Sequence, residues 1–236
     1  MLRSVDETHS RSAGTVRSLL ERNLVDGSLF RASLLRVPEG ERDAWLDVAL
    51  GLGELPDDGP ELPRGCVPYI PCSVDTLLCV VEQAPVRASD VFVDVGSGAG
   101  RASALVHLLT GAAVIGLEIQ PALVRASRDL FARLCLSRVS CALGDAANLT
   151  GHAGAGTVFF LYCPFSGDRL SKLVADLEPI ARTRMIRVCC VDVPLPPCPW
   201  LTLAGPAQPG ALAIYRSTLH EATVGGDRAG AEIYSE

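Results

Sequence analysis

Lysine is almost absent from this chain of 236 residues: of its 21 basic residues, Lys172 is the only lysine. A phosphate-binding Walker loop requires a Gly-Lys-Ser/Thr triplet, and the sequence contains none. Long apolar runs are also missing, because none reaches the roughly 18 residues that a membrane-spanning helix needs. Residues Met1 to Arg11 are polar and carry both charge signs, which predicts neither a signal peptide nor a membrane anchor. These absences exclude a Walker-type nucleotide site and disfavour a membrane partner.

Regularly spaced cysteines are lacking too, although the chain has nine cysteines. Their number is odd and no pair follows Cys-x-x-Cys spacing, so we expect neither a disulfide framework nor a metal site. We interpret most of them as small buried apolar side chains in a protein of the reducing cytoplasm. The net charge of −6 disfavours a protein that binds phosphate backbones, so nucleic acid is not the expected partner.

Composition divides the chain into three parts. Residues 1–65 form a predicted N-terminal helical extension with a linker, residues 66–220 the main domain, and residues 221–236 a flexible tail. Within the extension, residues 1 to about 12 are expected to be irregular. The stretch 53–65 is rich in Pro, Gly, Asp and Glu, which is typical of a linker or surface loop.

Short apolar segments alternate with amphipathic segments in the main domain. They predict strands and helices respectively, with strands over 91–95, 113–117, 139–143, 157–162 and 186–191, and helices over 73–84, 101–110, 121–136 and 167–180. This alternation predicts an α/β fold with a doubly wound, mostly parallel sheet that is covered on both faces. Two further strands, over 200–203 and 212–217, with a turn over 205–210, predict an antiparallel hairpin at the sheet edge.

The most informative stretch runs from Val93 to Arg101 and reads VDVGSGAGR. An apolar run ends in an acid, three glycines follow at alternate positions, and a helical pattern begins at once. This pattern predicts a strand, a tight turn and a helix N-terminus, where backbone can approach a ligand closely. In a dinucleotide-binding G-x-G-x-x-G loop the third glycine would fall at Arg101, whose side chain would clash. A pyrophosphate cradle is therefore disfavoured, and a tight turn without a ligand stays an alternative.

Two acids stand at the ends of the next predicted strands. Glu118 follows the strand 113–117, and Asp145 follows the strand 139–143. Ligands of open parallel sheets bind at the carboxyl ends of the strands. A carboxylate there can accept both hydroxyls of a ribose, and an acid followed by a small residue can bind an adenine amino group. Helix capping for Glu118 and an ordinary surface position for Asp145 are the alternatives, but together the acids predict a site for a nucleoside-containing ligand.

These motifs, in this order, resemble those of class I S-adenosylmethionine-dependent methyltransferases over roughly Cys66 to Ser217. The resemblance implies a Rossmann-like, seven-stranded sheet with an antiparallel last strand, and S-adenosylmethionine as the cofactor. It also implies that Asp94 lies near the methionine end of the cofactor and that the segment Pro68 to Pro71 closes over it. The cofactor-binding residues that follow from the resemblance are Tyr69, Asp94, Gly96, Ser97, Gly98, Gly100, Glu118, Ile119, Asp145, Ala146 and Tyr162.

The stretch Phe159 to Phe165, FFLYCPF, ends at the place that faces the transferred methyl group in this family. Enzymes that methylate planar amino groups often have Asp/Asn-Pro-Pro-Tyr/Phe there, whereas this chain has Cys163 in the polar position and a single proline. The apolar, aromatic stretch resembles more the Dot1-like protein-lysine methyltransferases, in which an aromatic channel admits an amine. We therefore expect Tyr162, Cys163 and Phe165 as catalytic-pocket residues. The first expected acceptor is a protein amine, with a small molecule second and nucleic acid third.

Two other classes of function stay open on the sequence alone. One is a non-catalytic module that binds the cofactor or a partner without turnover, because no strong general base is visible. The other is an NAD-dependent oxidoreductase, against which Arg101 argues.

Overall fold

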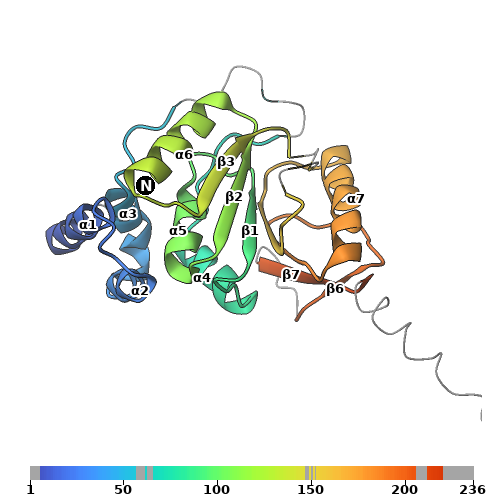
Figure 1. Cartoon of the computed structure of the whole chain (residues 1–236), viewed down its shortest axis with the longest axis horizontal. Helices are drawn as coiled ribbons and strands as arrows, with labels where there is room; N and C mark the ends of the chain where they lie inside the picture. Colours follow the sequence, from blue (N-terminus) through green and yellow to red (C-terminus); the bar gives the residue numbers. More distant parts are fainter. Residues whose placement is uncertain are drawn as a thin grey trace, which may run out of the picture.

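The computed structural model describes residues 6–56, 62, 66–146, 149, 151, 153–205 and 212–219. A seven-stranded sheet forms its centre, made of β1 (Val91–Val95), β2 (Ala113–Glu118), β3 (Val139–Leu143), β4 (Val158–Tyr162), β5 (Arg187–Val191), β6 (Leu201–Leu203) and β7 (Leu212–Ser217). The strand order is β3-β2-β1-β4-β5-β7-β6. Pairing is parallel from β3 to β5, and β7 pairs antiparallel with both β5 and β6. The predicted fold class is confirmed (Figure 1).

Helices cover both faces of the sheet. The described helices are α1 (Glu7–Leu20), α2 (Gly27–Leu35), α3 (Glu39–Leu50), α4 (Val74–Gln83), α5 (Arg101–Thr110), α6 (Pro121–Arg133) and α7 (Asp168–Thr183). Helix α7 lies on one face, and α4, α5 and α6 lie on the other (Figure 1). Because β1 to β5 pair in parallel, their carboxyl ends lie at one edge of the sheet.

Successive residues of the central strands point to opposite faces of the sheet. Phe92 of β1 and Phe160 of β4 stack with ring centroids 5.8 Å apart on the face covered by α4 and α5. Their neighbours Val93 and Phe159 belong to the hydrophobic cluster under α7. Because both faces of the central strands are buried, these strands are apolar at most positions, Asp94 of β1 being an exception, and this made them recognisable in the sequence.

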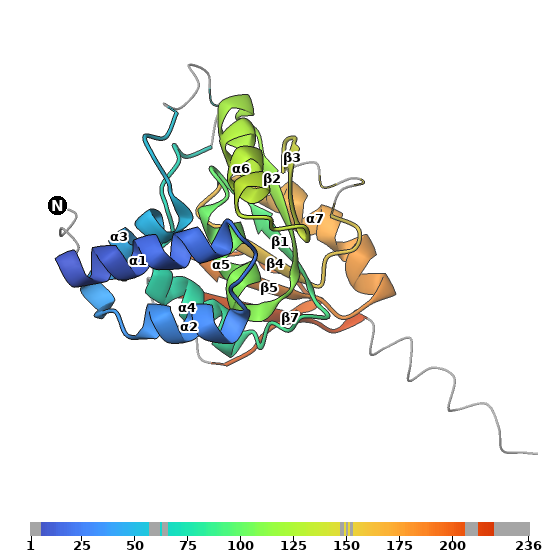
Figure 2. The same cartoon turned by 60° about the vertical axis from the view of Figure 1, so that its left-hand side comes forward.

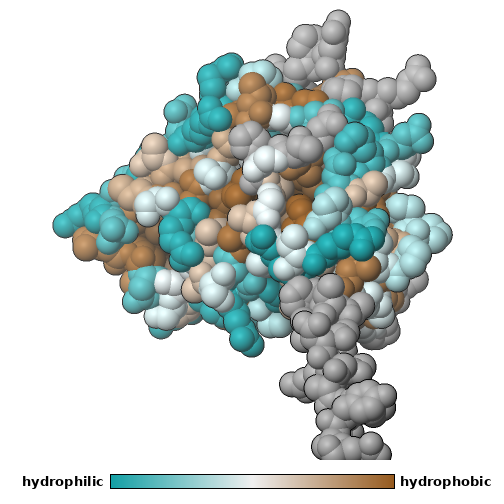
Figure 3. Space-filling model, turned by 45° about the vertical axis from the view of Figure 1, so that its right-hand side comes forward, coloured by the Kyte–Doolittle hydropathy of each residue, from teal (hydrophilic) through white to brown (hydrophobic). Residues whose placement is uncertain are grey.

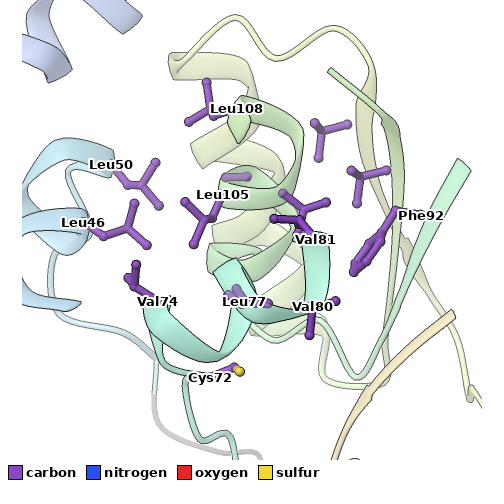
Figure 4. Packing of buried hydrophobic residues seen from close by; sticks show 14 of the residues in the cluster. Leu46, Leu50, Cys72, Val74, Leu77, Val80, Val81, Phe92, Leu105 and Leu108 are labelled. Atoms are coloured by element: carbon purple, nitrogen blue, oxygen red, sulfur yellow. The ribbon is translucent and has the colours of Figure 1, made fainter. Parts of the chain in front are cut away.

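The three N-terminal helices pack beside α4 and α5 (Figure 2). Figure 4 shows Leu46 and Leu50 of α3 pointing toward Leu77 of α4 and Leu105 of α5. All four side chains are fully buried, and the same cluster continues to Phe92 of the sheet. The N-terminal helices and the sheet thus share one continuous hydrophobic core.

The expectation that residues up to about 12 are irregular is wrong for residues 7–12, which belong to α1. Asp6 caps this helix, because its carboxylate accepts a hydrogen bond from the N–H of Thr8 (3.2 Å). Ala13, Val16 and Leu20 form its buried face. The helix is polar elsewhere, so its sequence alone gave too weak an apolar pattern to predict it.

Two helix ends also differ from the expected ones. Helix α6 ends at Arg133 rather than at residue 136, because Cys135 adopts a left-handed φ of 54° that turns the chain. Helix α7 runs past Pro179 and ends at Thr183 rather than at residue 180. Ala181 is fully buried in the cluster under α7, so tertiary packing extends this helix beyond its proline.

The surface seen in Figure 3 carries apolar patches separated by hydrophilic side chains. Within the described part of the chain, every helix is too short or too polar to span a membrane. The turn residues 206–210, the tail 221–236 and the linker residues 57–61 and 63–65 lie outside the described residues, so the expectations for them are not tested.

Candidate functional site

The glycine loop after β1 is fastened to the neighbouring strand. Gly96, Gly98 and Gly100 all have positive φ angles, of 80°, 54° and 82°, which favour glycine at each position. The N–H groups of Gly96 and Ser97 both donate to the carbonyl oxygen of Leu117 in β2, at 2.9 and 3.0 Å. The loop is therefore held in place before α5 begins.

Glu118, the last residue of β2, reaches the same loop. Its Oε2 accepts a hydrogen bond from the N–H of Gly98 (2.8 Å), and its Oε1 accepts one from the N–H of Gln120 (2.8 Å). The side chain is buried, yet it lines a cavity at the carboxyl edge of the sheet. Each carboxylate oxygen has a second lone pair, so Glu118 can accept further donors from a ligand in this cavity.

Asp145 lines the same cavity from the loop that follows β3. Its carboxylate forms an ion pair with the guanidinium of Arg169 in the first turn of α7. The Arg169 guanidinium also lies over the ring of Phe165, 5.6 Å from the ring centroid. These three residues tie the loop after β3 to the loop after β4 across the cavity.

The cavity has a volume of about 290 Å³ and brings together most of the residues that the sequence singled out. The predicted site residues that line it are Tyr69, Gly96, Glu118, Ile119, Asp145, Ala146, Tyr162, Cys163 and Phe165. Four others are not among the residues that line it, namely Asp94, Ser97, Gly98 and Gly100. The structure thus assembles the motifs around one cavity, with part of the glycine loop acting as its support.

Asp94 and Ser97 are buried and make side-chain contacts within the fold. The Asp94 carboxylate is 3% exposed and accepts a hydrogen bond from Ser103 Oγ (2.7 Å). Burial raises the pKa of Asp94 to about 6, the hydrogen bond from Ser103 lowers it, and the charge of Glu118 raises it. The Ser97 hydroxyl lies 3.6 Å from Cys141 Sγ. Asp94 is therefore an acid whose ionisation the fold opposes.

Two glycines of the loop make room for neighbouring aromatic rings. A Cβ atom on Gly98 would lie 2.0 Å from the ring of Tyr69, and one on Gly100 would lie 2.6 Å from the ring of Phe131. Tyr69 therefore lies directly on the loop, and burial raises the pKa of its hydroxyl to about 12. Gly100 instead allows α6 to pack closely against the start of α5.

The segment before α4 crosses the end of β4. Cys66 forms an antiparallel bridge with Phe165, and the N–H of Val67 donates to the carbonyl oxygen of Pro164 (3.4 Å). Val67 and Ile70 line the cavity and are exposed, at 41% and 55%. This segment forms one wall and an apolar rim of the cavity.

Among the residues that line the cavity, three with a charged or amide side chain were not predicted from the sequence: Gln120, Arg169 and Asp192. Asp192 directly follows β5, so the rule that selected Glu118 and Asp145 could have found it. Arg169 lies in the first turn of a helix, where no sequence motif marks it. Gln120 contributes its backbone N–H, a group that every residue except proline carries.

Comparison with known proteins gives support at the level of the fold. No family model matches the sequence, and no curated protein matches it. The candidate methyltransferase yhhF from Escherichia coli has a similar structure, with a TM-score of 0.52 and 20% identity, covering 69% of this chain and 89% of that chain. An RNA methyltransferase from Salinibacter ruber, in complex with S-adenosyl-L-homocysteine, gives a TM-score of 0.49 and 23% identity, covering 71% of this chain and 98% of that chain. The similarity to yhhF agrees with the predicted fold.

Proposed function

We propose that the chain is an S-adenosylmethionine-dependent methyltransferase whose cofactor binds in this cavity. The observation that carries the proposal is the buried carboxylate of Glu118, which lines the cavity at the end of β2. A carboxylate in this place can bind both hydroxyls of a ribose through charge-assisted hydrogen bonds. Asp145 offers an acceptor for the adenine amino group, and Ala146 beside it leaves room for the ring.

The cofactor, when bound, supplies a methyl group that is activated by a sulfonium. The chain itself supplies binding, orientation and exclusion of water. Leu117 and Ile119 provide apolar walls beside Glu118, and Tyr69 covers the glycine loop. Asp94 is proposed to act at the methionine end, while Ser97, Gly98 and Gly100 shape the loop through their backbone.

The acceptor that we propose is an amine, first of a protein and second of a small molecule. Tyr162 and Phe165 line the cavity as aromatic walls, and Val67 and Ile70 give it an apolar rim. Nucleic acid ranks third because of the net charge of −6. The cytoplasmic location inferred from the cysteines stays a prediction.

Titration calorimetry with S-adenosylmethionine, S-adenosylhomocysteine and NAD tests the proposed cofactor. We expect the first two ligands to bind and NAD to bind far more weakly. Glu118→Ala should weaken binding of S-adenosylhomocysteine by about 1.5–3 kcal/mol, since hydrogen bonds to a charged group are lost. The control is Glu82→Ala, which removes an exposed acid of α4. Unchanged affinity in Glu118→Ala, or preference for NAD, would overturn the proposal.

Methyl transfer is tested separately with methyl-labelled cofactor and fractionated cell extract. Label should appear in a protein or small-molecule fraction with wild-type protein and disappear with Glu118→Ala. Binding of the cofactor with no labelled product in any fraction would instead favour a non-catalytic module.

A further inference from the structure

The ends of β4 and β5 lie side by side and make the same turn. Tyr162 is paired with Val191 in the parallel register, so Cys163 and Asp192 are the first residues after each strand. Both have left-handed φ angles, of 43° and 54°. Such angles are uncommon outside glycine, although aspartate tolerates them better than most residues. Two neighbouring turns of this kind persist only where the surrounding structure holds them.

The thiol of Cys163 is one of the groups that hold these turns. Its Sγ lies 3.4 Å from each of the carbonyl oxygens of Val191 and Asp192, to which it donates. Burial raises the pKa of the Cys163 thiol, and the charge of Asp192 raises it further. A neutral thiol that is turned toward the backbone of β5 is a poor nucleophile and a poor partner for a substrate.

Asp192 presents the carboxylate at this end of the cavity. Its side chain lines the cavity and is exposed. Within the described part of the chain, Glu118 accepts two backbone hydrogen bonds and Asp145 pairs with Arg169. The described residues offer the Asp192 carboxylate neither a hydrogen bond nor an ion pair.

The strand order separates this carboxylate from the nucleoside side of the cavity. Glu118 ends β2, Asp145 follows β3 and Asp192 follows β5, and β1 and β4 lie between β2 and β5. A ligand held by Glu118 and Asp145 would therefore extend from them toward Tyr162 and Asp192.

We propose that Asp192 binds the cationic amino group of the methyl acceptor and thereby selects amines as substrates. The bound ammonium loses a proton to solvent before its nitrogen lone pair can accept the methyl group, and the Asp192 carboxylate then accepts a hydrogen bond from a remaining N–H. This inference rests on the proposed function of the cavity. It also accounts for Cys163, which stands where related enzymes often have a polar residue. Asp192, which follows the neighbouring strand β5, supplies the polar group for the acceptor instead. Cys163 holds the turn in which Asp192 lies.

Binding of two cofactor analogues tests this inference without a turnover assay. S-adenosylhomocysteine has a neutral thioether, whereas sinefungin has an aminated carbon where the cofactor has its methylated sulfonium. We expect wild-type protein to bind sinefungin more tightly. In Asp192→Asn the ratio of the two affinities should fall about three- to tenfold, with unchanged affinity for S-adenosylhomocysteine. Asparagine tolerates the left-handed backbone at this position, so the turn should persist.

Asp129→Asn is the matched control, because it removes an equal charge from the exposed side of α6. It should leave the affinity ratio unchanged. An unchanged ratio in Asp192→Asn, or an equal loss of affinity for both analogues, would overturn the role of Asp192. Failure of wild-type protein to bind either analogue would overturn the proposed function itself.

Discussion

At the scale of single residues, Asp94 is the side chain whose surroundings most oppose its charge. Its pKa is raised to about 6 by burial, from an ordinary value of 3.8. In the unfolded chain the carboxyl ionises near 3.8, whereas in the fold it stays protonated until about pH 6. The stability it contributes is therefore complete below pH 3.8 and is lost as the pH rises through 6. A buried acid retained at this cost is typical of a functional site.

Asp94→Asn should remove this cost and keep an oxygen that accepts from Ser103. We expect the free energy of unfolding to match that of the wild type near pH 4. At pH 7.5 the free energy of unfolding of the variant should exceed that of the wild type by roughly 2 to 3 kcal/mol, because each pKa unit corresponds to 1.36 kcal/mol. Urea unfolding at the two pH values measures the difference. A variant no more stable than the wild type at pH 7.5 would contradict the prediction.

The sequence predicted the acids of the site better than it predicted their partners. Glu118 ends one apolar strand and Asp145 lies two residues after the next, and the carboxyl ends of parallel strands meet at one edge. The pairing of Asp145 with Arg169 depends on how α7 packs on the sheet, which no local pattern encodes. The Cys163 thiol points to the carbonyl oxygen of Val191 in β5, and this contact likewise depends on how distant parts of the chain pack together.

At the scale of elements, Arg101 connects three segments that are far apart in the sequence. It opens α5, and its side chain is 5% exposed. The guanidinium donates to Asp43 Oδ1 (2.8 Å) and Asp47 Oδ1 (2.6 Å) of α3 and to the carbonyl oxygen of Cys72 (2.7 Å). The residue that argues against a dinucleotide loop thus anchors the helix after the loop to α3 and to the segment before α4.

Arg101→Met should destabilise the protein by about 2 kcal/mol. The variant leaves a buried carbonyl oxygen unsatisfied, and the loss is moderated because Asp43 and Asp47 are 38% and 40% exposed. Arg31→Met is the control, since Arg31 pairs with Glu82 on the surface and should contribute less than about 1 kcal/mol. Urea midpoints of the two variants check this. Equal effects would show that the buried position of Arg101 adds nothing.

At the scale of the whole molecule, the helices at the N-terminus and the sheet form one structure. The division of the chain at residue 65 came from composition, which records a polar linker but not packing. Leu46 and Leu50 of α3 belong to the same buried cluster as Leu105 and Phe92 (Figure 4). A fold whose parts share a core is expected to unfold as one cooperative unit.

The two tryptophans of the chain provide a probe for each half. Trp45 is fully buried among the N-terminal helices, and Trp200 is 7% exposed in the cluster under α7. Trp45→Phe and Trp200→Phe each leave one fluorophore. In each variant we expect the urea transition followed by fluorescence to coincide with that followed by far-ultraviolet circular dichroism. If the Trp45 signal in Trp200→Phe changed at lower urea than the circular dichroism, the N-terminal helices would be a separate unit. Coincident transitions would mean that α3 and the cavity form and are lost together, because Arg101 and the shared core join them.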